Sequence, residues 1–83
     1  MDKISTLRTT IDALDKQIMT LLDQRMATAI SIGEAKHKTQ LNIEDKNREA
    51  TIFKACESYT HKKALKEIYK TIIHTSKSLQ REE

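Results

Sequence analysis

Apolar residues recur along the first quarter of the chain in alternating steps of three and four residues. This apolar seam consists of Ile4, Leu7, Ile11, Leu14, Ile18 and Leu21. Such spacing puts the apolar side chains on one face of an α-helix, as in a coiled coil. The pattern predicts one long helix over residues 4–37, followed by a loop over residues 38–44.

Two shorter helices are expected after that loop. The second covers residues 45–57 and begins at Asp45, where an acidic side chain suits a helix N-terminus. The third covers residues 62–81 and carries an apolar stripe that includes Leu65, Ile68, Ile72 and Ile73. We therefore predict an all-α fold with three helices, in a single domain spanning residues 1–83.

The composition agrees with an all-α fold and limits the kinds of partner that we expect the protein to have. The 83 residues include no proline, one glycine and one cysteine, so neither turn-rich β-structure nor a disulfide framework is expected. A run of eighteen apolar residues and a signal-peptide stretch are both absent, which predicts a cytoplasmic protein that is not in a membrane. A net charge of +3, with acids and bases interspersed, does not demand a nucleic-acid partner.

The length of the first helix points to a second copy of the chain. At 1.5 Å per residue the helix over residues 4–37 is about 50 Å long. A compact chain of 83 residues has a radius of gyration of only about 12 Å, so it cannot cover such a helix. A homodimer is the natural way to bury the apolar seam.

Charged residues interrupt the inward face of the first two helices. Arg25 follows Ile18 by seven residues, where the seam predicts an apolar side chain, and Lys36 lies only about 20° from Arg25 around the helix. The inward stripe of the second helix begins with Asp45, Arg48 and Glu49.

The third helix shows the same feature, because Ser76 and Gln80 continue its apolar stripe. Buried charges and amides need partners. These polar groups therefore either pair with one another, Arg25 and Lys36 with Asp45 and Glu49, or surround a polar ligand. The pattern leaves both readings open.

Arg8 lies beside the seam, roughly 25 Å before Arg25 along a straight helix. The two arginines of one chain cannot easily hold one small molecule. Arg8 of an antiparallel partner could do so, whereas a solvated surface arginine is the simpler alternative.

Other chemistry is weakly supported. The three histidines lack the spacing of a metal site, and Cys56 is expected to be a small buried apolar residue. The stripe formed by Lys62, Lys66, Lys70 and Lys77 is typical of a solvated face.

The polar residues and their neighbours, in order, resemble the all-α chorismate mutase family over nearly the whole chain. The similar elements are residues 7–15 (L-R-x-x-I-D-x-L-D), 21–25 (L-L-x-x-R), 32–36 ((V/I)-G-x-x-K), 45–49 (D-x-x-R-E) and 72–80 (I-(I/M)-x-x-S-x-x-x-Q).

This resemblance implies an intertwined antiparallel helical homodimer that rearranges chorismate to prephenate without metal or cofactor. It implies that Lys36 and Gln80 donate to the ether oxygen of the substrate, and that Glu49 binds its ring hydroxyl. The resemblance also implies that the substrate carboxylates are bound by Arg25, by the partner's Arg8 and by Ser76. It implies that Asp45 and Arg48 support Glu49, and that the apolar walls of the site are formed by Ile32, Ile52 and Ile73.

Two departures from the family pattern stand out. The loop before Asp45 lacks a proline, and Lys77 stands where relatives often carry a small apolar residue. At about 60° from Gln80 around the helix, Lys77 either points outward or alters the charge of the pocket. A related lyase that releases pyruvate from isochorismate and a non-enzymatic helical adaptor remain the alternative functions.

Overall fold

The computed structural model describes residues 2–81 and contains three helices, α1 (Lys3–Thr39), α2 (Lys46–Cys56) and α3 (Lys62–Arg81). There is no β-strand within this range. The prediction of an all-α chain with three helices is confirmed. Helix α1 continues two residues beyond the expected end, because its last turn is closed by a backbone conformation that the apolar pattern does not reveal.

Short polar side chains begin the first two helices. Asp2 precedes α1 and accepts a hydrogen bond from the backbone N–H of Ser5 at 2.7 Å. Asp45 precedes α2 and accepts from the backbone N–H of Arg48 at 3.0 Å. Each carboxylate satisfies an N–H group that lacks a partner within the helix.

Helix α1 ends without glycine or proline. Gln40 adopts a left-handed conformation with φ of 58°, and the N–H of Leu41 then donates to the carbonyl oxygen of Lys36 at 2.9 Å. This arrangement satisfies a terminal carbonyl group and turns the chain out of the helix. A side chain in this conformation costs about 1–2 kcal/mol, which the closing bonds help to offset.

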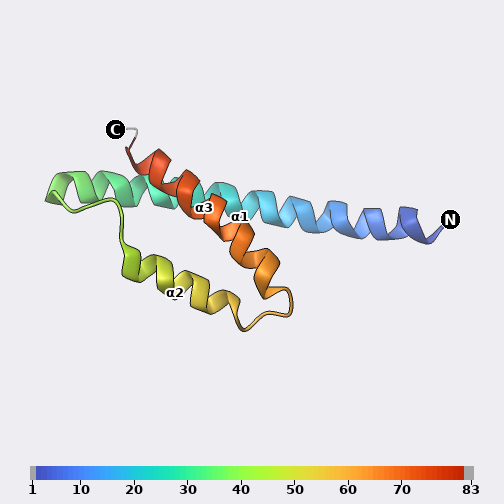
Figure 1. Ribbon diagram of the computed structural model, residues 1–83. Coiled ribbons are helices and arrows are strands. Elements are labelled where there is room, and N and C mark those ends of the chain that lie inside the picture. The colour runs from blue at the N-terminus through green and yellow to red at the C-terminus, as the bar shows by residue number, and fades with distance from the viewer. Residues whose placement is uncertain (1, 82–83) are drawn as a thin grey trace.

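The three helices form an open arrangement and not a compact bundle (Figure 1). Helix α3 crosses the second half of α1, α2 packs against α3, and the first half of α1 extends beyond both. The chain is 57 Å long in its longest dimension. Its radius of gyration of 16.1 Å exceeds the value of about 12 Å for a compact chain of this length.

The buried core lies where α3 packs against its two neighbours, and it is small. Its apolar members are Ala29, Cys56, Ile72 and Ile73. Cys56 is buried, as predicted. Gly33 is also buried, and a Cβ atom there would lie 2.8 Å from the Cα of Gln80. A glycine at this crossing therefore lets α1 and α3 approach closely.

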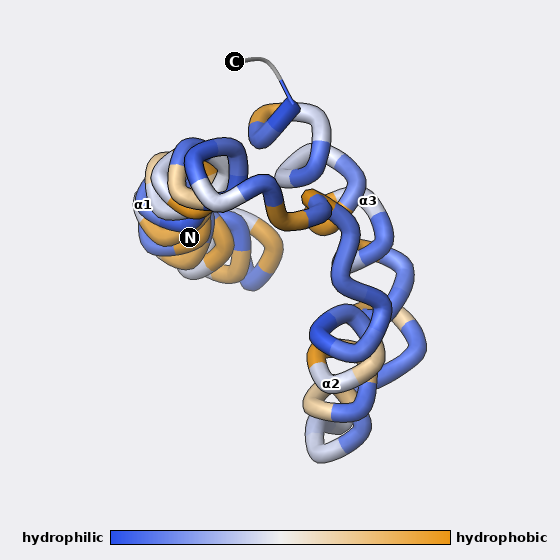
Figure 2. The backbone as a smooth tube through the Cα atoms, turned by 90° about the vertical axis from the view of Figure 1, so that its left-hand side faces the viewer, coloured by the Kyte–Doolittle hydropathy of each residue, from blue (hydrophilic) through white to orange (hydrophobic). Residues whose placement is uncertain are grey.

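The apolar seam is not covered by its own chain. All six seam residues are at least half exposed, from 50% for Leu14 and Ile18 to 63% for Leu21. Figure 2 shows apolar positions following one side of α1 toward the N-terminus. Ile68 of α3, placed on the inward stripe by the sequence, is also exposed. Among the described helices, none is both long and apolar enough to cross a membrane.

Candidate active site

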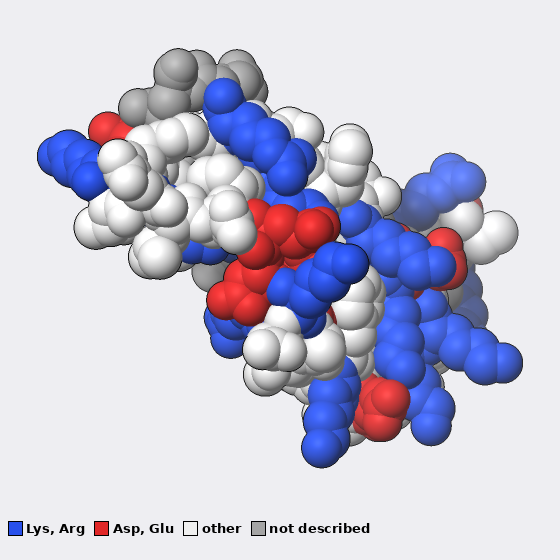
Figure 3. All heavy atoms as spheres, turned by 60° about the vertical axis from the view of Figure 1, so that its left-hand side comes forward, with Lys and Arg blue, Asp and Glu red and all other residues white. Residues whose placement is uncertain are grey.

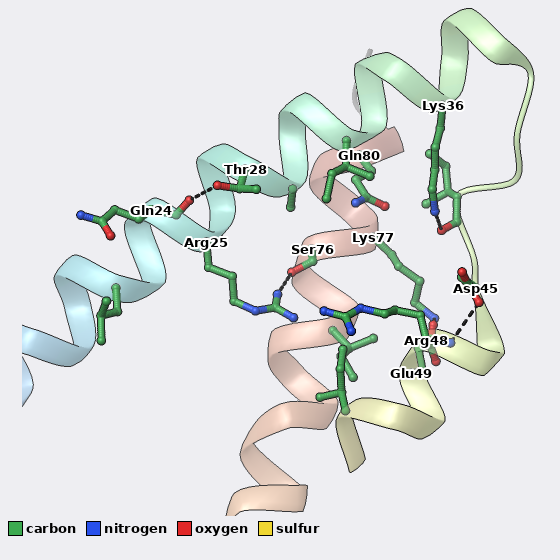
Figure 4. Close-up of a pocket in the computed structure, with 16 residues that line it drawn as sticks. Gln24, Arg25, Thr28, Lys36, Asp45, Arg48, Glu49, Ser76, Lys77 and Gln80 are labelled. Carbon is green, nitrogen blue, oxygen red and sulfur yellow. Dashed lines mark hydrogen bonds and ion pairs between the residues drawn. The ribbon is translucent and has the colours of Figure 1, made fainter. Parts of the chain in front are cut away.

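A cavity of about 440 Å³ lies among the three helices and the loop that joins α1 to α2. Figure 4 shows polar side chains from all three helices pointing into it. Its lining residues are Leu21, Gln24, Arg25, Thr28, Ala29, Ile32, Lys36, Ile43, Asp45, Arg48, Glu49, Ile52, Ile73, Ser76, Lys77 and Gln80.

Arg25 of α1 is held by α3. Its Nη1 donates a hydrogen bond to the hydroxyl of Ser76 at 2.7 Å, and that hydroxyl donates to the carbonyl oxygen of Ile72 at 2.8 Å. The guanidinium carbon also lies 5.9 Å from the centroid of the Tyr69 ring, within the range of a cation–π contact. These neutral partners orient Arg25 without cancelling its charge.

Lys36 reaches the cavity from the last part of α1. Its Nζ donates to the carbonyl oxygen of Ile43 at 3.0 Å, which ties the loop to the helix. An ammonium group has three N–H donors, so two remain for another acceptor. Lys36 and Arg25 line the same cavity, as their positions on the helix predicted.

Lys77 of α3 pairs with Glu49, one of the two carboxylates that the sequence offered as partners for Arg25 and Lys36, and with Glu44 of the loop. Its Nζ lies 3.0 Å from Glu44 Oε1 and 3.0 Å from Glu49 Oε2, and its side chain is only 19% exposed. Hydrogen bonds to Glu44 and Glu49 raise the pKa of Lys77 above its ordinary value. The hydrogen bond and charge of Lys77 lower the pKa of Glu44.

The internal network that we considered, with Arg25 and Lys36 neutralised by Asp45 and Glu49, is therefore wrong. Among residues 2–81, Glu49 pairs with Lys77, and the Asp45 carboxylate caps α2. The sequence missed this arrangement because Glu44 lies in the loop, outside any helical repeat. Of the two orientations considered for Lys77, the structure shows the one that reaches the cavity (Figure 4).

Gln80 is 92% buried, beside the closest approach of α1 and α3. Its backbone carbonyl oxygen lies 2.9 Å from Nε2 of His37. Because a carbonyl oxygen can only accept, this bond requires the proton on Nε2. Contacts to Gly33 and His37 thus fix the last turns of α3 against α1 and set where the Gln80 amide lies.

The cavity carries an excess of positive charge. Four cationic side chains and two carboxylates line it, which gives a formal charge of +2. Figure 3 shows acidic atoms gathered near the centre of one face with Lys and Arg side chains around them. Within residues 2–81, no group of three or more His, Cys, Asp or Glu side chains is placed to hold a metal ion.

The structure brings together every predicted site residue except Arg8. Arg8 is exposed on the first half of α1, away from the cavity of its own chain. Residues that the sequence reasoning missed include Leu21, Thr28 and Ala29, which lie one helical turn from Arg25 and could have been found by that spacing. Ile43 lies in the loop, where no periodic signal exists.

Two comparisons with known proteins point to one family. A family model described as chorismate mutase type II matches residues 7–81. A bifunctional chorismate mutase/prephenate dehydratase from Aquifex aeolicus (strain VF5) is 36% identical over 89 residues, a stretch that covers 98% of this chain. The chain spans about a quarter (25%) of the length of that relative.

A solved structure shares the fold of this chain. The chain is similar to a conserved hypothetical protein from Pyrococcus furiosus, with a TM-score of 0.86 and 33% sequence identity. The similarity covers 98% of this chain and 99% of that one.

Proposed function

Because the chain belongs to the chorismate mutase type II family, we propose that it rearranges chorismate to prephenate for the biosynthesis of phenylalanine and tyrosine. The observation that carries this proposal is the cavity itself. Arg25 and Lys36 project into it with neutral partners only, beside the buried Gln80 and the carboxylate of Glu49. Such a set suits a small dianion that also offers an ether oxygen and a hydroxyl group.

The binding of chorismate follows from the chemistry of each group. The guanidinium of Arg25 is suited to a bidentate contact with one substrate carboxylate, and Ser76 already orients it. The Glu49 carboxylate is an acceptor for the ring hydroxyl, with Asp45 and Arg48 next to it. The apolar walls would come from Ile32, Ile52 and Ile73.

Catalysis in this proposal is electrostatic and conformational, with no covalent intermediate. The cavity holds the substrate in the folded conformer that the rearrangement requires, which removes much of its entropic cost. Negative charge develops on the ether oxygen as the C–O bond breaks. In this mechanism the Lys36 ammonium and the Gln80 amide donate the hydrogen bonds that stabilise that charge.

The proposal includes a cytoplasmic homodimer. Arg8 is far from its own cavity, and the exposed seam offers a surface on which a second copy running antiparallel could pack. Arg8 of that copy would supply a second guanidinium for the other substrate carboxylate. The exposed seam and the position of Arg8 away from its own cavity support the same arrangement.

The experiment is direct incubation of the purified protein with chorismate. We expect loss of chorismate with prephenate as the product, identified by mass and by its acid conversion to phenylpyruvate. Incubation with isochorismate is run in parallel, and release of pyruvate there without prephenate formation from chorismate would assign a lyase. No reaction with either substrate would overturn the proposed function. Arg25→Ala should be nearly inactive, whereas Lys63→Ala on the exposed face of α3 should match the wild type.

A further inference from the structure

Lys77 bridges two carboxylates at the edge of the cavity. Glu44 comes from the loop before α2, and Glu49 comes from the first turn of α2. Both Nζ–O distances are 3.0 Å, so the lysine joins α3 to the loop and to α2 at one point. Figure 4 shows the Lys77 side chain directed toward Glu49 and not toward the centre of the cavity.

The two carboxylates differ in accessibility. The side chain of Glu44 is 44% exposed, whereas that of Glu49 is 23% exposed and faces the cavity. Glu44 is therefore the outer anchor that holds the ammonium at the edge, and Glu49 is the inner partner. The bond to Lys77 uses Oε2 of Glu49, and its other oxygen, Oε1, can accept a hydrogen bond from a ligand.

We propose that Lys77 is a positioning residue that fixes the Glu49 carboxylate for the hydroxyl group of the substrate. This inference rests on the proposed mutase function and adds a residue to it. A glutamate side chain has several free rotamers, and holding it before the substrate arrives lowers the entropy cost of binding and of reaching the reactive geometry. In this role Lys77 acts through Glu49, with its ammonium held between Glu44 and Glu49.

This ion pair differs from an ordinary surface pair. Lys70 and Glu67 lie on one helix, with side chains 64% and 73% exposed, and pairs of that kind contribute little to stability. Lys77 is 19% exposed and joins separate segments of the chain. Its partner also lines the cavity, so its removal would change the orientation of a group that the substrate meets.

The test compares Lys77→Met with Lys66→Met. Lys66 also joins α3 to the α2 region, through Glu57 at 3.0 Å, but that pair lies at the far end of α2. We expect Lys77→Met to lower kcat/KM by about tenfold or more, since small misplacements of a reacting geometry can cost about a hundredfold. Lys66→Met should keep wild-type kinetics. It should lower the midpoint of thermal unfolding by about the same small amount as Lys77→Met does. Lys77→Arg should recover most of the lost kcat/KM, because it restores a cationic donor.

A double-mutant cycle with Glu49→Gln separates action through Glu49 from other roles. In the Glu49→Gln background, Lys77→Met should cause little further loss of kcat/KM, because the charged partner is already gone. Equal losses in both backgrounds would overturn the inference, as would wild-type kinetics for Lys77→Met. Failure of the proposed function appears separately, as absence of chorismate turnover in the wild-type protein.

Discussion

The two halves of α1 carry the same helical repeat but have different surroundings. Residues 3–21 present large aliphatic side chains that stay exposed, whereas residues 22–39 pack against α3 through the small residues Ala29 and Gly33. Side-chain size separates the two roles. Small residues stand where α3 of the same chain must come close, and large ones stand where the chain leaves a face open.

The difference also has an energetic side. Complete burial of a large aliphatic side chain contributes about 1.5–3 kcal/mol, and the six seam residues, which are half exposed or more, forgo about half of that in an isolated chain. In proteins, most of the stability of a helix comes from the packing of its apolar face against other elements. The first half of α1 is therefore the region where a second copy would change stability most, and the second half is the region that holds the cavity.

The largest expected effect is loss of the proposed dimer after Leu14→Arg. An arginine in the middle of the seam would have to be buried without a partner, which costs several kcal/mol. We expect monomers by sedimentation velocity, reduced helix content by circular dichroism and almost no mutase activity. Lys16→Glu, on the opposite face of the same turns, is the control and should leave all three unchanged. A fully active dimeric Leu14→Arg protein would contradict the role given to the seam.

Gln80→Ala tests the region where α3 packs against the second half of α1. Removal of one donor aimed at charge in a transition state typically costs about 2.7–4 kcal/mol, so kcat should fall by about two to three orders of magnitude. The free energy of unfolding should change by far less than the activation free energy does, so the midpoint of thermal unfolding should stay close to that of the wild type. Nearly unchanged turnover in a folded variant would remove the Gln80 amide from the mechanism.

A mixing experiment asks whether the two halves serve the same active site. Arg8→Ala and Gln80→Ala homodimers should each be nearly inactive. When the two are unfolded together in equal amounts and refolded, about half of the dimers should be mixed. One site of each mixed dimer then carries both lesions and the other carries neither, so about a quarter of wild-type activity should return. If Arg8 served its own chain, every site would keep one lesion and no activity would return.

Gly33→Ala should have a smaller effect. The new methyl group would lie 2.8 Å from the Cα of Gln80, so α1 and α3 must separate slightly. Overpacking of this kind costs about 1–3 kcal/mol, and it also moves the last turns of α3. We expect a lower unfolding midpoint together with a reduced kcat. Glu34→Ala, one position further along α1 and exposed, should show neither change.

The smallest effect concerns the pH dependence of the Lys77–Glu44 pair. The lowered pKa of Glu44 means that its contribution to stability is present above the ordinary glutamate pKa and is lost as pH falls through the lowered value. The raised pKa of Lys77 means that its contribution persists until pH rises through that raised value. The unfolding midpoints of wild type and Glu44→Gln should therefore differ by a constant amount between the ordinary pKa values of glutamate, about 4.3, and lysine, about 10.4, and converge as pH falls through the lowered pKa of Glu44. A difference that peaks at neutral pH would point to another titrating group.

The sequence predicted those parts of the molecule that follow a helical repeat. Three helices, the shared face of Arg25 and Lys36 and the placement of Ser76 and Gln80 at the cavity all come from spacing along a helix. The proposed chemical roles of these residues come from the family resemblance, and the experiments described above test them. The ion pairs of Lys77 could not be predicted, because Glu44 lies in a loop and Lys77 is a long side chain that can turn either way. The orientation of a flexible lysine depends on which acceptors lie near it, and Glu44 and Glu49 come near Lys77 only in the folded chain.

The projecting half of α1 has a consequence for how the molecule would fold. Its contacts within the chain are local, so little holds it in a helix before another surface arrives. If two copies bury each other's seams, folding and association become one process, and the unfolding midpoint rises with protein concentration. Refolding would then be second order at low concentration. The folded fraction of such a protein would thus depend on its concentration in the cell as well as on its sequence.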